Sequence, residues 1–563
     1  MEAGHGNSRL TTGARVLAEM LEGYGVTHLF HVPAILRRTM VEIEEHTSIK
    51  RVRPHGEKPA AYMADGFARA SGRPGVCAAQ AVGALNLAAG LRDAHLAHSP
   101  VIAFTGGRDP HTRFHKAYQE VDDLPAFSSV TKMNVTVDAV ERIPDMIRQA
   151  FREATSGAPG PVHIQFAGNE GQVDAQEADM EIRCEQQFAI VPPSRPAAVD
   201  ADLVRALELL AAAERPVFVA GSGVRASGAG PALVQLAERM GIPVATSHNG
   251  KDIIAGTHPL SVGVVGTYSR GSANRVVLEA DLVCFAGTET GGMTTHSWKV
   301  PAVGTPAIQI DIEAEALGRN YPLQMAINAD AGTALSRMLE LVEGAAGHED
   351  WRAVAARHVM DWRTEYASLL ESDQVPIRPE RLCAELTNLV PDDGVVVVDT
   401  GHAGMWMGGM FDLRQPTQSY LRSAGHLGWA FPSSLGAKCA LPDRPVVCFT
   451  GDSGLWYHIA EIETAVRWGI NTVTVVNNNH SGNQSKRGFD AVYGGTQSAQ
   501  AREMWVFTEV DFSRLATDIG AVGIRVEKPA EFAPAFDRAL SADRPVVIDV
   551  VTDIDALAPL PVE

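Results

Sequence analysis

Two polar residues, Asp452 and Asn479, each stand at or just past the end of a run of apolar residues. The apolar runs 446–450 and 472–476 predict buried strands, and residues 455–468 predict the helix between them. A right-handed helical crossover makes two such strands parallel and brings their carboxyl ends to one edge of the sheet. Asp452 and Asn479 are therefore predicted to face each other, although 27 positions separate them.

Two oxygen ligands beside a helix start would suit a phosphate-bound Mg²⁺ ion. Backbone N–H groups of Ser453 and Gly454, in the tight loop predicted over 451–454, would serve the phosphate. Magnesium takes six oxygens, of which usually one or two come from carboxylates. The alternative is an Asx-type turn at Asp452 and a polar loop over 477–479. The spacing alone leaves both interpretations open.

Another carboxylate, Glu57, opens a helix of small residues predicted over 60–68. At a helix start a glutamate usually does no more than complement the helix dipole. Its position alone therefore does not indicate that Glu57 has a catalytic role.

The elements that would position these residues alternate between strands and helices along the whole chain, which predicts an α/β fold of doubly wound parallel sheets. The Pro-rich segment 191–196 and the Gly-Ala segment 344–347 interrupt this rhythm. We therefore predict three domains, over 1–185, 197–345 and 375–555. An Arg-Pro pair precedes four predicted strands, and similar surroundings at 73–74 and 444–445 suggest that the first and last domains are similar units.

The composition is that of an ordinary globular protein, which excludes a disordered chain, a collagen and a small disulfide scaffold: 563 residues, 45% hydrophobic and 20% charged, with a net charge of −19. The negative charge disfavours nucleic acid as a partner. Six cysteines without metal-ligand spacing predict buried, reduced thiols. Residues 1–10 lack the pattern of a signal peptide, and no apolar stretch is long enough to cross a membrane. We expect a cytoplasmic protein.

Gly451-Asp452 followed by Asn478-Asn479 resembles the thiamin diphosphate signature of the acetolactate synthase and pyruvate decarboxylase superfamily, although Ser453 replaces its usual glycine. The resemblance implies three α/β domains, with a Rossmann-like one in the middle. It implies that Asp452, the Asn479 side chain and the Ser481 carbonyl bind Mg²⁺, and that Ser453 and Gly454 lie against the cofactor.

Further segments of the last domain carry the same resemblance. Residues 425–432 resemble the segment that places an apolar residue under the cofactor, which implies that Leu427 holds its bent conformation. Residues 399–406 resemble the loop that meets the diphosphate and the aminopyrimidine, which implies contacts from Gly401 and His402. Taken alone, Leu427 would be an ordinary core leucine and 399–406 a glycine-rich loop.

In the first domain, residues 55–68 resemble the segment that supplies the cofactor-activating acid, which implies that role for Glu57. In this family the acid reaches a cofactor held by another subunit, so the resemblance implies a homodimer at least, and often a tetramer. By the same resemblance Asn86 lies near the cofactor and Gln119 at the reacting centre. His31 is a further candidate catalytic residue, with a structural histidine as the alternative.

The middle domain carries a near-match to a dinucleotide fingerprint at 220–226. Relatives bind FAD, ADP or nothing there. The acidic and basic stretch of FAD-containing acetolactate synthases is replaced here by residues 288–293, so FAD or ADP is not favoured.

The resemblance implies a thiamin diphosphate- and Mg²⁺-dependent enzyme that cleaves or joins C–C bonds of 2-oxo acids or related carbonyl compounds. A simple decarboxylase, a 2-hydroxyacyl-CoA lyase and a 1,2-dione hydrolase remain open within the superfamily. A flavin-dependent 2-oxo acid oxidase, or a nicotinamide-dependent oxidoreductase, is the alternative from another class. A third alternative is a catalytically silent partner subunit, but the presence of Glu57 argues against it.

Overall fold

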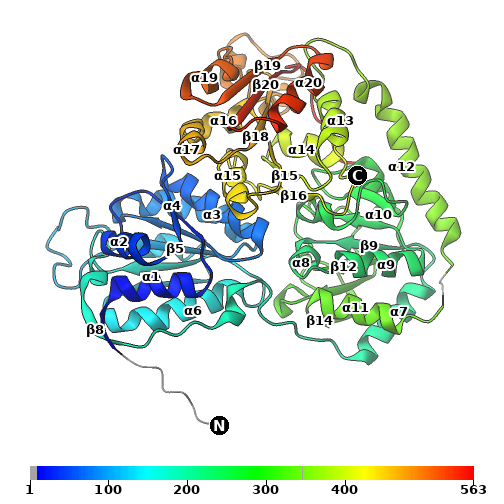
Figure 1. Cartoon of the computed structure of the whole chain (residues 1–563). Coiled ribbons are helices and arrows are strands. Elements are labelled where there is room, and N and C mark those ends of the chain that lie inside the picture. The colour runs from blue at the N-terminus through cyan, green and yellow to red at the C-terminus, as the bar shows by residue number, and fades with distance from the viewer. Residues whose placement is uncertain (1–8, 345–346, 563) are drawn as a thin grey trace. The chain divides into compact units, whose positions relative to one another are not determined.

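The computed structural model describes residues 9–344 and 347–562, in which three six-stranded parallel sheets are flanked by helices (Figure 1). The predicted α/β class with three doubly wound sheets is confirmed. The exact domain boundaries remain predictions. Residues 1–8, where no signal peptide is expected, and residues 345–346 of the Gly-Ala segment lie outside the described residues.

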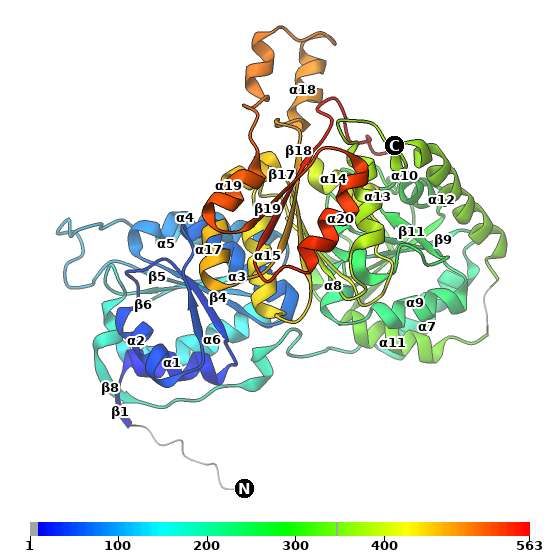
Figure 2. The ribbon, with the colours of Figure 1, turned by 45° about the horizontal axis from the view of Figure 1, so that its top comes forward.

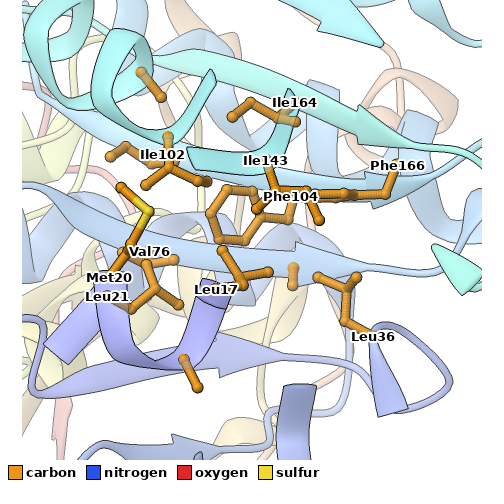
Figure 3. Close-up of a cluster of buried hydrophobic side chains, with 14 of the residues drawn as sticks. Leu17, Met20, Leu21, Leu36, Val76, Ile102, Phe104, Ile143, Ile164 and Phe166 are labelled. Carbon is orange, nitrogen blue, oxygen red and sulfur yellow. The ribbon is translucent and has the colours of Figure 1, made fainter. Parts of the chain in front are cut away.

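The N-terminal sheet has the strand order β3-β2-β4-β5-β7-β6. Helices α1 (Gly13–Gly23), α2 (Arg37–His46) and α6 (Ile143–Thr155) cover one face, and α3 (Glu57–Ser71) and α4 (Ala84–Leu96) cover the other (Figure 1). Figure 3 shows part of the core under α1, where Leu17 meets Phe104 and Val76 of the sheet. The strands are β2 (His28–His31), β3 (Lys50–Val52), β4 (Gly75–Ala79), β5 (Val101–Gly106), β6 (Met133–Val137) and β7 (Val162–Phe166); β1 (Arg9–Thr12) and β8 (Glu177–Met180) form a separate antiparallel pair.

The middle sheet has the order β11-β10-β9-β12-β13-β14, which is the doubly wound Rossmann order. Its two faces carry separate hydrophobic cores, one with α7 (Asp200–Ala212), α9 (Gly230–Met240) and α11 (Ala331–Leu341), the other with α10 (Gly271–Glu279) and α12 (Glu349–Leu370). The strands are β9 (Pro216–Ala220), β10 (Val244–Thr246), β11 (Ser261–Val264), β12 (Leu282–Ala286), β13 (Ala307–Asp311) and β14 (Leu323–Asn328).

The C-terminal sheet has the order β16-β15-β17-β18-β20-β19. When the strands of each sheet are renumbered in chain order, this is 2-1-3-4-6-5, the same order as in the N-terminal sheet. The similarity predicted for the first and last domains is therefore found in their topology. The strands are β15 (Val395–Val398), β16 (Ser419–Arg422), β17 (Val446–Gly451), β18 (Val473–Asn478), β19 (Val522–Val526) and β20 (Val546–Val551).

Helices surround the C-terminal sheet as well, and α18 (Gln484–Val492), which has no buried side chain, stands away from it (Figure 2). The others are α13 (Pro379–Leu389), α14 (His402–Gly409), α16 (Asp452–Tyr457), α19 (Phe512–Ile519) and α20 (Pro529–Leu540).

The chain divides into two compact units. The first contains the chain up to Ser194 together with residues 424–443 and 458–471, and the second contains residues 195–423, 444–457 and 472 onward. The first unit therefore holds α15 (Ala430–Ala440) and α17 (Glu461–Trp468), although the strands on either side of them in the sequence belong to the second.

Within the first unit, α15 packs closely along α3. A Cβ atom on Gly436 would lie 1.9 Å from the Met63 carbonyl oxygen, and one on Gly66 would lie 2.0 Å from that of Ser433. Glycine is required at both positions because the two helix backbones touch there.

Two local predictions around Asp452 are wrong. No loop spans 451–454, since β17 runs to Gly451 and α16 begins at once with Asp452. The single helix predicted over 455–468 is two helices, α16 and α17, separated at residues 458–460. The apolar spacing continues through the break, which is why the sequence pattern did not reveal it.

Of the six cysteines, all free thiols, Cys184 and Cys439 are half-buried and the other four are buried. Among the described residues, no helix is both long enough and apolar enough to span a bilayer.

Candidate active site

The carboxyl edge of the C-terminal sheet brings Asp452 to the loop that follows β18. Asp452 Oδ1 accepts a hydrogen bond from the Ser453 N–H (2.6 Å), and Oδ2 accepts one from the Ser481 N–H (2.9 Å). The Ser481 hydroxyl donates to Asn479 Oδ1 (2.8 Å). Asp452, Asn479 and Ser481, which the sequence predicted as metal ligands, therefore lie together.

Asp452 is 2% exposed, and no ion pair among the described residues includes it. Burial raises the pKa of Asp452 to about 7, although backbone N–H groups of Ser453 and residues 479–481 oppose the shift. A buried carboxylate gains most from a cation that replaces its lost hydration. The described residues hold no group of three His, Cys, Asp or Glu side chains with metal-site geometry. One carboxylate with amide and carbonyl oxygens is a donor set for Mg²⁺ rather than for a transition metal.

A second buried carboxylate, Asp399, lies under the start of α16. Its Oδ2 accepts a hydrogen bond from the Thr450 hydroxyl (3.2 Å). A Cβ on Gly454 would lie 2.4 Å from Thr450 Oγ1 and 2.7 Å from Asp399 Oδ2. Gly454 is therefore needed so that the first turn of α16 can approach the strand ends. The sequence placed Asp399 only within the predicted cofactor loop 399–406, with no role of its own, and assigned no role to Thr450.

Gly401 and His402 form the turn into α14, after β15. Gly401 has φ 68° and ψ −146°, a conformation that essentially only glycine adopts. His402 is the first residue of α14, and its Nδ1 is buried without a hydrogen bond. Burial, with a contribution from Arg487, lowers the pKa of His402 to about 4. A neutral imidazole with an unsatisfied nitrogen beside a helix start is suited to contact a polar ligand group.

In the N-terminal domain, Glu57 is the first residue of α3 and is half-buried. The Asn86 side chain, from α4, donates to Glu57 Oε2 (3.2 Å). A Cβ on Gly83 would lie 2.5 Å from Glu57 Oε1, so glycine leaves room for the carboxylate. The structure thus brings together two of the predicted residues, Glu57 and Asn86, and shows a partner for the carboxylate.

Gln119 lies on the loop between β5 and α5 (Leu124–Phe127). Its Oε1 accepts hydrogen bonds from the side-chain NH₂ groups of Gln80 (3.0 Å) and Asn169 (3.5 Å). Neither residue was predicted. Both follow strands, β4 and β7, so the shared carboxyl edge of the parallel sheet was the signal that could have found them.

His31 ends β2 and is buried, and its Nδ1 lacks a hydrogen-bond partner. Burial, with the nearby charges of Arg51 and Arg53, lowers the pKa of His31 to about 4. No hydrogen bond among the described residues links its side chain to Glu57 or Gln119. Its catalytic role remains a prediction.

Leu427 is half-buried in a turn that an acidic residue holds. Asp93 accepts hydrogen bonds from the backbone N–H groups of residues 424, 425 and 426 (2.9–3.0 Å). Arg69 donates to the same carboxylate (2.8 Å). Burial opposes ionisation of Asp93, but Arg69 and these N–H groups outweigh it and lower its pKa. The turn that carries Leu427 is therefore fixed by a buried charge.

The glycine fingerprint of the middle domain has a packing explanation. The Gly223 N–H donates to the Gly287 carbonyl (2.9 Å), and a Cβ on Gly223 would lie 2.7 Å from Gly287 Cα. The short helix α8 (Ser222–Ala226), which follows β9, therefore packs directly against the loop after β12. That FAD or ADP is not favoured here remains a prediction.

Two kinds of chemistry follow from these groups. The C-terminal edge offers oxygen ligands for a divalent cation and helix starts for an anion such as a diphosphate. The N-terminal edge offers a carboxyl group for proton exchange and a set of amides for polar recognition.

Comparison with known protein families matches three segments of the chain. Residues 11–126 match the N-terminal TPP binding domain of thiamine pyrophosphate enzymes, residues 203–338 match their central domain, and residues 399–550 match their C-terminal TPP binding domain.

Comparison with individual proteins gives matches along nearly the whole chain. The probable acetolactate synthase large subunits of Methanococcus aeolicus and Methanocaldococcus jannaschii are 30% and 31% identical to it, each over 96% of this chain and 92% of the relative. A glyoxylate carboligase of Escherichia coli O157:H7 is 31% identical, over 95% of this chain and 92% of its own.

Proposed function

Because the chain belongs to the thiamine pyrophosphate enzyme family, as a thiamin diphosphate-dependent enzyme of the acetolactate synthase type, we propose that it is a Mg²⁺-dependent carboligase acting on 2-oxo acids. It would remove CO₂ from one 2-oxo acid and join the remaining carbon unit to a second carbonyl compound. The observation that carries this proposal is the meeting of buried Asp452 with Asn479 and Ser481. The names of the relatives, acetolactate synthase and glyoxylate carboligase, support the reaction class.

The residues of the C-terminal edge fit a diphosphate held through a metal ion. Asp452, the Asn479 side chain and the Ser481 carbonyl would hold Mg²⁺. The Gly454 N–H, with Gly401 and His402, would bind the diphosphate, and Ser453, whose N–H donates to Asp452, would lie beside it. Leu427, fixed by Asp93, would support the thiamin rings.

Thiamin diphosphate supplies a carbon nucleophile and an electron sink for the bonding pair that stays behind when CO₂ leaves. Glu57 would hold a proton between its carboxyl group and the aminopyrimidine ring, while Asn86 keeps the carboxyl group oriented through Oε2. Gln119 would contact the substrate.

We also propose that the active enzyme is at least a homodimer in which Glu57 serves the cofactor of the neighbouring chain; a tetramer fits as well. The exposed apolar side chains of Val82 (62%) and Leu85 (51%) stand beside Gly83 and Asn86, the residues that contact Glu57. Apolar side chains exposed at a functional residue are typical of a surface that another chain covers. We place the enzyme in the cytoplasm.

Cleavage of a 2-hydroxyacyl-CoA and hydrolysis of a 1,2-dione are the alternative reactions. Both use the same cofactor chemistry, so the substrate distinguishes them. Incubation with pyruvate, glyoxylate, a 2-hydroxyacyl-CoA and a cyclic dione, followed by mass spectrometry of the products, would identify the reaction. Formation of a 2-hydroxy-3-oxo acid from a 2-oxo acid is the expected result, and turnover of the CoA ester or dione alone would contradict carboligation.

Isothermal titration calorimetry tests the cofactor and metal. The wild-type protein should bind thiamin diphosphate with Mg²⁺ present and at least ~10-fold more weakly without it, because the metal joins Asp452 to the diphosphate. Asp452→Asn should lose this Mg²⁺ dependence, and Asp361→Asn, an exposed aspartate of α12, should keep it. Binding that is indifferent to Mg²⁺ in the wild type would refute the metal site.

A further inference from the structure

Four side-chain amides at the carboxyl edge of the N-terminal sheet form a chain of hydrogen bonds with a single direction. The Glu170 N–H donates to Gln172 Oε1 (3.1 Å), and Gln172 Nε2 donates to Asn169 Oδ1 (3.0 Å). Asn169 Nδ2 and Gln80 Nε2 then both donate to Gln119 Oε1. Every step passes from an NH to a carbonyl oxygen, and the chain ends at Gln119.

This arrangement fixes the polarity of Gln119. An amide oxygen has two lone pairs; the Gln80 NH₂ engages the Gln119 oxygen at 3.0 Å, and the Asn169 NH₂ adds a longer, weaker contact at 3.5 Å. No hydrogen bond among the described residues uses Gln119 Nε2, so its NH₂ group remains available as a donor. Hydrogen bonds that all run in the same donor-to-acceptor direction polarise each other. This strengthens the terminal donor, which is the Gln119 NH₂ group.

The backbone around Gln119 is held in place as firmly as the side chain. Gln119 has φ 61°, and two neighbours in the loop have similar left-handed values, Phe114 (70°) and Lys116 (56°). A non-glycine residue in this region is strained and persists only where the surroundings impose it. Here the Glu120 carboxylate accepts the N–H groups of Phe114 (2.7 Å) and Ala117 (3.0 Å), which closes the loop.

The two strand-end donors are also tied to each other. The Ala81 N–H, next to Gln80, donates to the main-chain carbonyl of Asn169 (3.0 Å). The loops after β4 and β7 therefore present Gln80 and Asn169 as one unit to the loop that carries Gln119.

We propose that Gln80 and Asn169 are positioning residues that hold Gln119 as an oriented hydrogen-bond donor, and that the Gln119 NH₂ group binds an anionic oxygen of the substrate, such as a 2-oxo acid carboxylate. This inference rests on the proposed function and adds to it the polarity of the substrate contact. An amide fixed as a donor favours a carboxylate and disfavours a group that must donate a proton.

The test reverses the polarity at one point. In Gln80→Glu a carboxylate of equal size accepts from the Gln119 NH₂, so the Gln119 oxygen turns toward the substrate and repels its carboxylate. Calorimetric titration of the thiamin diphosphate- and Mg²⁺-loaded protein with oxamate, an unreactive 2-oxo acid analogue, should show at least ~10-fold weaker binding. The KM for the 2-oxo acid should rise in step, with kcat less affected. Gln80→Met, which neither donates nor accepts strongly, should give a smaller loss.

Two controls separate positioning from other roles. In a Gln119→Ala background, Gln80→Glu should have little further effect on oxamate binding, because the residue through which it acts is gone. The thiamin diphosphate affinity and the thermal unfolding midpoint of Gln80→Glu should stay near the wild-type values.

Several outcomes would overturn the inference. They are unchanged oxamate affinity in Gln80→Glu, an equal loss with and without Gln119, or no oxamate binding by a wild-type protein that binds the cofactor and turns over a 2-oxo acid. A wild-type protein that fails to bind thiamin diphosphate would instead refute the proposed function itself, and the inference with it.

Discussion

Glu57 and Asp452 are carboxylates at the first position of a helix, yet their surroundings equip them for different tasks. Asp452 is buried among backbone N–H groups, where a carboxylate attracts a cation. Glu57 is half-buried, and Asn86 is its side-chain partner. A carboxyl group held by one amide retains a second oxygen for proton exchange with a ligand.

Replacing Glu57 tests this assignment. Glu57→Gln keeps the size of the side chain and removes its acidity, so kcat should fall by roughly 10²-fold or more while stability changes little. Steady-state kinetics and thermal unfolding would measure the two effects. Glu141→Gln, an exposed glutamate of the same domain, should retain full activity. Wild-type turnover by Glu57→Gln would exclude the proton-transfer role.

At the scale of elements, the crossing of α3 and α15 depends on two glycines. In Gly436→Ala the new methyl group would lie 1.9 Å from the Met63 carbonyl oxygen, so the two helices must move apart. Overpacking of this kind costs about 1–3 kcal/mol or more. The unfolding free energy, measured by urea denaturation, should fall by at least that amount.

A glycine on an exposed helix supplies the matched control. A methyl group added at Gly488 of α18 would have no atom within 4 Å, so Gly488→Ala should stabilise the protein by up to ~1 kcal/mol through helix propensity. Equal effects at positions 436 and 488 would show that the close contact between α3 and α15 contributes nothing to stability.

The βαβ unit around Asp452 shows which elements the sequence pattern predicts and which it does not. Alternation of apolar runs with helical segments predicted β17, β18 and the meeting of Asp452 with Asn479, because parallel topology leaves few other arrangements. The break between α16 and α17 was not predicted, because the helical periodicity of apolar residues continues across it. Gln80 and Asn169 were not predicted either, because their hydrogen bonds to Gln119, over 39 and 50 positions, depend on the conformation of the loops at the sheet edge.

For the whole molecule, the assignment of Glu57 to a neighbouring chain gives a complementation test. Glu57→Gln and Asp452→Asn chains should each have low activity. When co-expressed, mixed dimers should contain one site with both residues intact, so about a quarter of the wild-type activity should return, since half of the dimers are mixed and each has one of two sites. Activity no higher than that of the parents would mean that each chain serves its own site.

A buried lysine makes the stability of the second unit depend on pH. Lys251 is 7% exposed, and its Nζ donates to the Gly408 carbonyl (3.0 Å), near the Arg270–Asp412 ion pair. Burial, with the repulsion of Arg270, lowers the pKa of Lys251 to about 7 from its ordinary 10.5. Between these values the unfolded chain binds one proton more than the folded chain, so stability rises with pH across this window.

Lys251→Met should remove this rise. Between about pH 7 and pH 8.5 the gain in unfolding free energy should be about 1.5 kcal/mol smaller in the variant than in the wild type. Urea denaturation at the two pH values would measure it. Lys299→Met, a lysine of the same domain, gives the comparison, and a parallel pH dependence in Lys251→Met would show that Lys251 keeps an ordinary pKa in the folded protein.

The first compact unit is built from three stretches of chain, since residues 424–443 and 458–471 join the segment that ends at Ser194. A gene truncated after codon 194 would encode every strand of the N-terminal sheet and would still omit α15, which covers the small-residue face of α3. It would also omit the turn that satisfies the Asp93 carboxylate. Sequence boundaries are thus poor guides for dissecting this enzyme into fragments, and shuffling of segments between relatives would have to exchange α3 and α15 together.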